Sequence, residues 1–146
     1  PTVMRLYNPS TYQHFYTSYN CEVTALANLN GFKLEGDAFY HNNPSAPDAV
    51  VVHRLYNPST RLHLWATTQE DINNATQAAG YRYEGPAFWA IKPTTGGSIV
   101  VHRLYNPTTY KHLWTTTQAE INSAMQFSGY KYEGPAFWAP GSTIPQ

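Results

Sequence analysis

One twelve-residue segment occurs three times in this chain. The third copy, residues 103–114, reads Arg-Leu-Tyr-Asn-Pro-Thr-Thr-Tyr-Lys-His-Leu-Trp, and the others are residues 54–65 and 5–16. Each copy begins 49 residues after the previous one, and no gap is needed. The match continues to one aromatic residue late in each copy: Tyr40, Trp89 and Trp138. A fixed period of this size indicates one supersecondary unit used three times.

The period limits the folds available to a chain of 146 residues. A unit of this length buries too little surface to fold alone, so the copies must share one core. We therefore predict a single domain, residues 1–146, with internal repeats at 1–49, 50–98 and 99–146. Three similar units close most simply around a pseudo-threefold axis, although an open stack is also possible.

Each unit is predicted to begin with a hairpin. Residues 50–56 are rich in β-branched and aromatic side chains and are typical of a strand. Residues 57–60, Asn-Pro-Ser-Thr, are typical of a turn. Residues 62–67 form the second predicted strand, in which His63 and Trp65 share one face.

A short helix and a returning strand complete the predicted unit. Thr68 and Thr117 stand at the start of an apolar helical pattern, as N-caps do, whereas the first copy lacks this threonine. Gly80 ends the pattern in the second copy. Pro86 interrupts the strand that follows, which indicates an edge or a bulge.

The expected fold class is therefore mainly β with short helices. Each unit of about 49 residues should contain a hairpin, a helix and a strand. The closed arrangement would resemble a β-trefoil or a three-bladed toroid, and the helix argues against a plain trefoil. The linkers, residues 41–48 and 91–98, are too short to separate independent domains.

Composition argues against several classes of partner. Charged residues make up only 12% of the chain, and the formal net charge is +0. This balance gives no reason to expect binding to nucleic acid or to a membrane surface. No apolar run is long enough to cross a membrane. The first residue, Pro1, fits either a processed secreted chain or a cytosolic chain without a signal peptide.

The sequence offers no recognisable catalytic or metal site. Paired carboxylates, a unique serine nucleophile, clustered metal ligands and a glycine-rich phosphate loop are all missing from the pattern. Cys21 is the only cysteine, and Glu70 and Ala119 occupy its place in the other copies. We therefore expect a protein that is not an enzyme and uses no metal or cofactor.

The repeated motif resembles a known family. Arg-Leu-Tyr-Asn-Pro, then His-(Phe/Leu)-(Tyr/Trp), then Glu-Gly-x-Ala-Phe-(Tyr/Trp) is similar to a tandem repeat of unknown function found in secreted bacterial proteins and in fungi. Related units are often attached to cell-wall or polysaccharide hydrolases. The resemblance covers nearly the whole chain and implies a binding module for carbohydrate. It supplies no catalytic residues.

Repeated polar residues have two explanations, a repeated structural role or a repeated ligand site. One Arg and one Glu in each unit suggest a hydrogen-bonded ion pair, such as Arg54 with Glu84, although Glu84 and Glu133 are alternatively sugar ligands. Asn57 and Asn106 precede proline, as turn residues do. His63 and His112 either fix the hairpin to the helix cap or bind a ligand beside an aromatic ring.

The aromatic side chains suggest sugar binding. Their faces can stack on the CH face of a sugar while nearby polar groups bind its hydroxyls. The alternative is that these rings build the shared core. The predicted ligand-binding residues are His14, Tyr16, Asn57, His63, Trp65, Glu84, Trp89, Asn106, His112, Trp114, Glu133 and Trp138.

The function predicted from the sequence is a lectin with up to three equivalent shallow sites, whose partners are glycans or glycoconjugates. Three weak sites would give avidity on a multivalent surface. One alternative is a protein-binding or inhibitory module that uses linker residues 42–48. Another is a purely structural repeat that binds no sugar.

Overall fold

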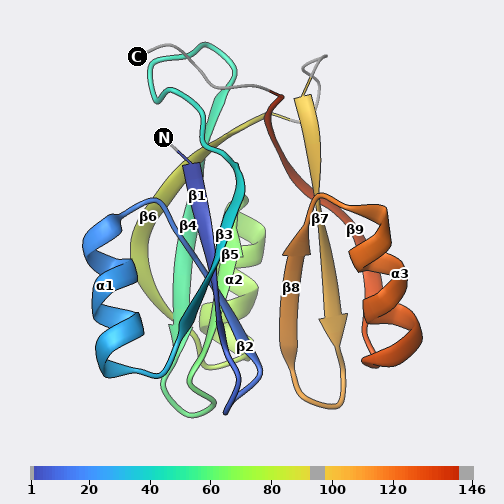
Figure 1. Cartoon of the computed structure of the whole chain (residues 1–146). Coiled ribbons are helices and arrows are strands. Elements are labelled where there is room, and N and C mark those ends of the chain that lie inside the picture. Colours follow the sequence, from blue (N-terminus) through green and yellow to red (C-terminus); the bar gives the residue numbers. More distant parts are fainter. Residues whose placement is uncertain (1, 93–97, 142–146) are drawn as a thin grey trace.

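The computed structural model describes residues 2–92 and 98–141. The chain repeats the order strand, strand, helix, strand (Figure 1). The first unit contains β1 (Thr2–Asn8), β2 (Gln13–Thr17), α1 (Asn20–Leu29) and β3 (Lys33–Tyr40). The second contains β4 (Ala49–Asn57), β5 (Leu62–Ala66), α2 (Gln69–Ala78) and β6 (Arg82–Ile91). The third contains β7 (Ser98–Asn106), β8 (Lys111–Thr115), α3 (Gln118–Phe127) and β9 (Lys131–Pro140).

The strands form two curled sheets, which together make a half-barrel (Figure 1). The first sheet has the order β2-β1-β3, and the second has the order β5-β4-β6-β9-β7-β8. The second and third units join through one backbone pair, Ile91 with Trp138. The expected class, mainly β with short helices, is confirmed.

Each hairpin closes as its sequence predicts. The Asn57 side-chain oxygen accepts hydrogen bonds from the backbone amides of Ser59, at 2.9 Å, and Thr60, at 3.3 Å. The Asn57 amide group donates to the carbonyl of Ala79, at the C-terminus of α2 (2.9 Å). This one side chain therefore shapes the turn and also fastens the helix to the hairpin. Asn8 and Asn106 make the same set of bonds in their own units.

Replacing Asn106 with alanine should destabilise the fold. The substitution removes the part-buried bonds to Thr108, Thr109 and Ser128, so the turn and the end of α3 lose their shared side-chain partner. We expect the free energy of unfolding to fall by about 1–3 kcal/mol, measured by urea denaturation. Asn106→Asp is the comparison variant, because it keeps the acceptor but replaces the donor with a second, charged oxygen. A loss below 0.5 kcal/mol in the alanine variant, a rough threshold, would contradict this structural role.

The helices begin and end where the sequence indicates. Thr68 accepts a hydrogen bond from the amide of Asp71 at 3.1 Å, and Thr117 caps α3 in the same way. The first helix has no side-chain cap, as expected from its missing threonine. Gly80 lies just beyond α2 at φ +78°, a left-handed conformation that glycine adopts without strain.

The third strand of each unit is continuous but bulged. β6 shifts its register against β4 twice, once between Val52 and His53 and again between Arg54 and Leu55. The first shift lies beside Pro86, so the predicted irregularity there is confirmed as a bulge. The second leaves Glu84 without an opposite residue, and its carboxylate bonds to Arg54 instead.

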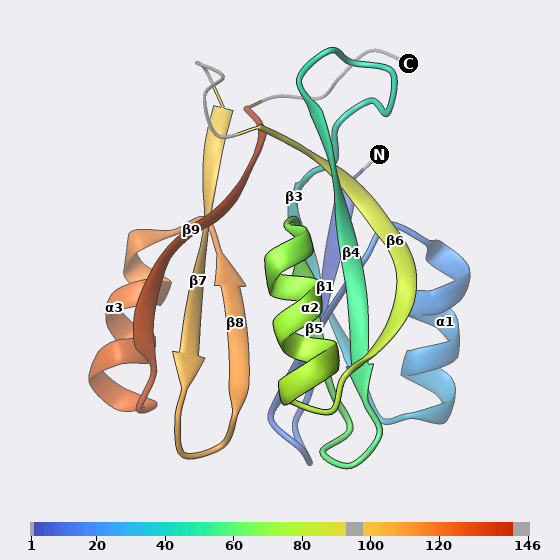
Figure 2. The ribbon, with the colours of Figure 1, turned by 180° about the vertical axis from the view of Figure 1, so that it is seen from behind.

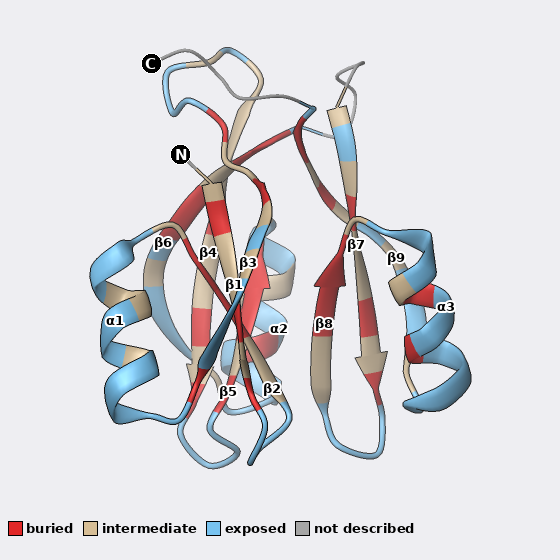
Figure 3. Ribbon diagram, viewed as in Figure 1, coloured by how far each residue is buried: buried red, intermediate tan, exposed pale blue. Residues whose placement is uncertain are grey.

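Buried residues lie on strands of all three units (Figure 3), and aromatic rings from all three units meet in the core. Tyr16, Trp65 and Trp114 make three edge-to-face contacts with centroids 5.2–5.6 Å apart. A second set, Phe39, Phe88 and Phe137, has centroids 5.6–5.9 Å apart. Each set takes one residue from the same repeated position of every unit. These contacts explain how units too small to fold alone share one core.

The first linker is anchored by one buried side chain. Asn42 in the first linker is buried, and its amide group donates to Asp48 and to the carbonyl of Ala90, both at 3.1 Å. It therefore holds the linker against the second unit. Most of the second predicted linker, residues 93–97, lies outside the described residues.

Candidate functional site

The hairpin of each unit contacts the helix of another at what we call a seam. The 1–2 seam joins Arg54 of the second hairpin to Glu22 of α1. The 2–3 seam brings Arg103 of the third hairpin near Asp71 of α2. The 3–1 seam joins Arg5 of the first hairpin to Glu120 of α3. The predicted Arg–Glu pairing within a unit is confirmed, but this second carboxylate from another unit was not predicted.

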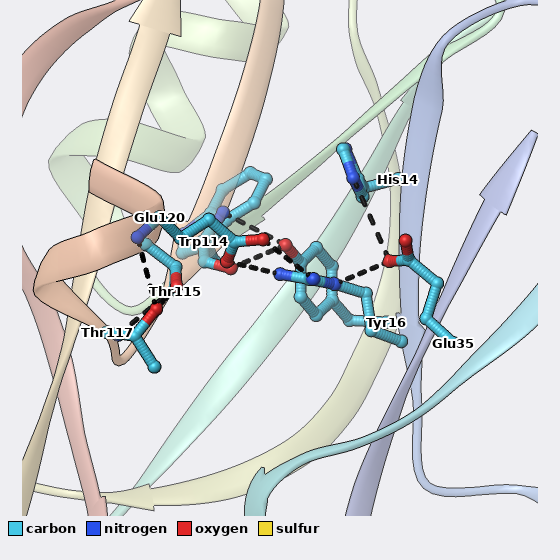
Figure 4. Close-up of polar contacts among 8 residues, drawn as sticks. His14, Tyr16, Glu35, Trp114, Thr115, Thr117 and Glu120 are labelled. Atoms are coloured by element: carbon cyan, nitrogen blue, oxygen red, sulfur yellow. Dashed lines mark hydrogen bonds and ion pairs between the residues drawn. The ribbon is translucent and has the colours of Figure 1, made fainter. Parts of the chain in front are cut away.

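The 3–1 seam is closed by strong ion pairs (Figure 4). The guanidinium of Arg5 donates to both Glu120 carboxylate oxygens, at 2.7 and 2.9 Å. Its Nε donates to Glu35 at 2.7 Å. Lys111 reaches across the same seam, where its ammonium donates to the carbonyl of Thr11. Two-pronged pairing of this kind fixes geometry as well as adding stability.

The 1–2 seam is closed by a different set of contacts. Arg54 donates to Glu22 at 2.9 Å and to Glu84 at 2.8 Å. The Phe15 ring lies beneath the Arg54 guanidinium, 5.0 Å away, and packs edge-on against His63 at 4.8 Å. Gln13 also crosses this seam and donates to the carbonyl of Arg61 at 2.8 Å.

The 2–3 seam contains a cavity of about 460 Å³. Figure 2 shows α2 facing the β7–β8 hairpin on the two sides of this seam. Tyr81 and the apolar side chains Leu62 and Leu64 line it from the second unit. Tyr105 and His112 line it from the third. A concave site with aromatic walls and a few polar groups is a plausible ligand pocket.

The 3–1 seam holds a smaller pocket of about 210 Å³ beside Arg5, Glu35 and Glu120. Departures from the repeat accompany the larger space in the 2–3 seam. Leu62 replaces Gln13 and Lys111, so it has no polar group to cross the seam. Leu64 replaces Phe15, whose ring packs in the 1–2 seam, whereas the third unit also has a leucine, Leu113, at this position. Leu104 and Leu113 of the third hairpin form a small cluster with Ile121 and Ala124 of α3, separate from the main core.

The ion pair in this seam is also looser. Asp71 replaces Glu22 and Glu120, and its carboxylate lies 3.7 Å from Arg103, beyond hydrogen-bonding distance. Ala66 replaces the threonine that donates to the acid in the first unit, where Thr17 bonds Glu22 at 2.6 Å. Arg103 keeps its bond to Glu133 at 2.8 Å. Both Arg103 and Asp71 therefore retain hydrogen-bonding capacity toward the pocket.

The three repeated histidines are neutral at pH 7. Burial, followed by the nearby Arg103, lowers the pKa of His112 to about 3. Burial and the arginine of the same unit lower the pKa values of His14 and His63 to about 4. Each imidazole packs on a tyrosine ring of its own hairpin, with centroids 4.7–4.9 Å apart. Among the described residues, none of these histidines forms a hydrogen bond with a helix cap. The predicted role of fixing the hairpin to the helix is therefore not observed.

The predicted platform of Trp65, Trp114 and Tyr16 is wrong. These side chains are at most 2% exposed, because the β-strand face that carries them points into the shared core. Tyr16 is further fixed by its hydroxyl, which donates to the Trp114 carbonyl at 2.6 Å. A sugar cannot stack on rings that other rings already cover. The alternative weighed from the sequence, that these rings build the core, is the one observed.

The remaining predicted residues are distributed over several places. His112, Glu133 and Asn57 all line the 2–3 pocket, although Asn57 comes from the opposite unit. Asn106 belongs to the turn and helix contacts of its own unit. His63 and Glu84 lie in the closed 1–2 seam, and His14 lies in the closed 3–1 seam. Trp89 and Trp138 are half-buried and do not line the pocket.

Several pocket residues were missed from the sequence. Asp71, Tyr105 and Tyr110 line the pocket but are not among the predicted ligand-binding residues. The signal that could have identified the site was a departure from the repeat. Leu62 stands where the other copies have the polar residues Gln13 and Lys111. Asp71 stands where they have Glu22 and Glu120.

Neither a metal site nor a membrane-spanning helix is found in the described part of the chain. No group of three or more histidine, cysteine or acidic side chains there could hold a metal ion. None of the described helices combines the length and apolar character needed to cross a bilayer.

Comparison with protein families matches residues 2–140 to a domain of unknown function, DUF5648. The chain belongs to this family. The match spans all three units, from β1 to the end of β9. Comparisons with curated proteins and with solved structures give no match.

Proposed function

We propose that the chain is a carbohydrate-binding domain with one open sugar site, the 2–3 pocket. The observation that carries the proposal is the pocket itself, about 460 Å³ in volume and walled by tyrosine rings and partly unsatisfied charged groups. A pyranose ring needs an aromatic face and a set of hydrogen-bond donors and acceptors. Tyr81 and Tyr105 supply the former, and Arg103 and Asp71 supply the latter.

The loosened ion pair suits adjacent sugar hydroxyls. A hydroxyl both donates and accepts, so one can accept from the Arg103 Nη1 group and its neighbour can donate to the Asp71 carboxylate. Such hydrogen bonds to charged groups are stronger than those between neutral groups. The other two seams leave less of this capacity, since Glu22 and Glu120 already bond the equivalent arginines. We therefore propose one site in place of three equivalent ones.

The proposal includes the arrangement of the units. We propose a closed, three-bladed ring around a pseudo-threefold axis. Two sets of matched rings support it, since Tyr16, Trp65 and Trp114 meet one another and so do the three phenylalanines. The order of the seams supports it too, because every hairpin meets the helix of the preceding unit and the first meets the last.

Closing the pocket should abolish sugar binding. Leu62→Lys gives the 2–3 seam the side chain that crosses the 3–1 seam at Lys111, so its ammonium should reach the third hairpin and fill the entrance. We expect wild-type protein to bind at least one glycan on an array. Titration calorimetry with that glycan should give one site per chain. The variant should bind it at least about tenfold more weakly in titration calorimetry.

Leu29→Lys is the matched control, because Leu29 is 80% exposed on α1 and does not line the pocket. This control should bind like the wild type, and thermal unfolding should establish that both variants fold. Unchanged affinity in Leu62→Lys would disprove the proposed site. An array with no bound glycan would disprove the proposed function.

A further inference from the structure

The charges that face the 2–3 pocket are unbalanced. Its charged lining among the described residues consists of Asp71, Arg103 and Glu133, so two carboxylates face one guanidinium. His112 adds no charge at pH 7, since burial lowers its pKa to about 3. The pocket therefore carries a net negative charge in a partly enclosed space, where solvent screens charges less than at an open surface.

One of the two carboxylates is available to a ligand. Glu133 is held by Arg103, whose Nε donates to it at 2.8 Å. Asp71 lies 3.7 Å from the same guanidinium, and its side chain is 41% exposed. Its equivalents, Glu22 and Glu120, are hydrogen-bonded to arginines at 2.7–2.9 Å. Of the three acids at this repeat position, Asp71 therefore lies farthest from its arginine.

The tyrosine rings that line the pocket also favour a positively charged ligand group. Tyr81, Tyr105 and Tyr110 all line the pocket. The face of a tyrosine ring attracts cations through its quadrupole, most strongly where water is excluded. A positively charged group in the pocket would therefore interact favourably with the rings as well as with the carboxylate.

We propose that the preferred ligand is a sugar with a free amine, an inference that rests on the proposed sugar site. Its ammonium group binds the Asp71 carboxylate, and a hydroxyl on the neighbouring carbon accepts a hydrogen bond from Arg103. A sugar with a carboxylate is disfavoured, because Asp71 and Glu133 would repel it. A neutral sugar binds through its hydroxyls alone and more weakly.

Three chains of equal length test the preference. The probes are β-1,4-linked tetramers of glucosamine, N-acetylglucosamine and glucose, titrated into wild-type protein at pH 6 and low salt. We expect the amine-bearing tetramer to bind about five- to tenfold more tightly than the other two. The preference should shrink as salt is added, because salt screens the added charge.

Asp71→Asn should remove the preference, so that the glucosamine and glucose tetramers bind this variant with affinities within about twofold of each other, a threshold well below a tenfold effect. Glu70→Gln is the matched control, since Glu70 is the exposed neighbour on α2 and does not line the pocket. It should keep the preference, and an equal effect of both variants would overturn the inference by tracing it to overall charge.

The remaining outcomes separate the two proposals. If glycans bind on the array but the glucosamine tetramer binds no more tightly than the glucose tetramer, the inference of an amine-bearing ligand fails and the sugar site stands. If no glycan binds, both fail.

Discussion

Lowering the pH from 7 to 4 is expected to unfold this protein. His14, His63 and His112 are neutral in the folded state, with burial as the main reason that their pKa values are about 4, 4 and 3. In the unfolded chain a histidine has a pKa near 6.5. Below pH 6.5 the unfolded state therefore binds more protons than the folded state, and stability falls as the pH falls.

The size of this effect follows from the same difference. Each histidine whose pKa falls from 6.5 to about 4 on folding lowers the free energy of unfolding by about 3 kcal/mol between pH 7 and pH 4. Three such residues together can approach the whole stability of a small domain, roughly 5–15 kcal/mol. Glu22 and Glu120 act in the same direction at lower pH. Although burial opposes their ionisation, their bonds to Arg54 and Arg5 lower their pKa values, so protonation breaks those pairs.

Urea denaturation at pH 7, 6, 5 and 4, followed by tryptophan fluorescence, measures the effect. His63→Gln should reduce the number of protons taken up on unfolding by about one, and therefore flatten the pH dependence. The substitution also changes contacts with Phe15 and Tyr56, so its effect on stability at pH 7 is compared separately. A free energy of unfolding that stays constant from pH 7 to pH 4 would refute the prediction.

The local structure was predictable because the sequence contains three versions of it. The turn at Asn57, the cap at Thr68 and the end of α2 at Gly80 depend on short-range interactions. The residues responsible occur in all three copies, or in two of them for the capping threonine. The Arg–Glu pairing was also predictable, because a chain with so few charges must pair those it buries.

The direction in which β5 faces was not predictable. Alternation correctly places His63 and Trp65 on one face, yet it does not say whether that face meets solvent or another unit. In this fold Leu64 is 8% exposed while Trp65 meets Tyr16 and Trp114 across the units, so residues on both faces are buried. Periodicity is informative about exposure only where one face of a sheet is open.

The pocket was not predictable for a related reason. It lies between units, so it depends on residues distant in sequence, such as Asp71 and Arg103. Searching for identity among the copies led to residues that build the fold, including Asn57 and Trp65. The pocket is lined by Leu62 and Asp71, two positions at which the second copy departs from the other two.

Replacing Trp65 with alanine is expected to reduce the free energy of unfolding by about 3–5 kcal/mol. The ring is 2% exposed and contacts Phe15, Tyr16 and Trp114 with centroids 5.2–5.4 Å apart. Its removal leaves a cavity where all three units meet, and the surrounding strands can relax only partly because their backbones are paired. Urea denaturation at pH 7 measures the loss.

Trp89→Ala is the matched control, since it removes the same side chain from a half-buried position on β6. It should cost clearly less than Trp65→Ala, because less surface returns to water and fewer contacts are lost. The comparison also distinguishes the core role of Trp65 from the sugar platform expected from its sequence pattern. If Trp65→Ala remained as stable as the wild type and lost only glycan binding, the ring would be a ligand contact and the shared core would have to lie elsewhere. If instead stability collapses in Trp65→Ala while folded Leu62→Lys protein loses binding, then the rings hold the units together and the seam binds the sugar.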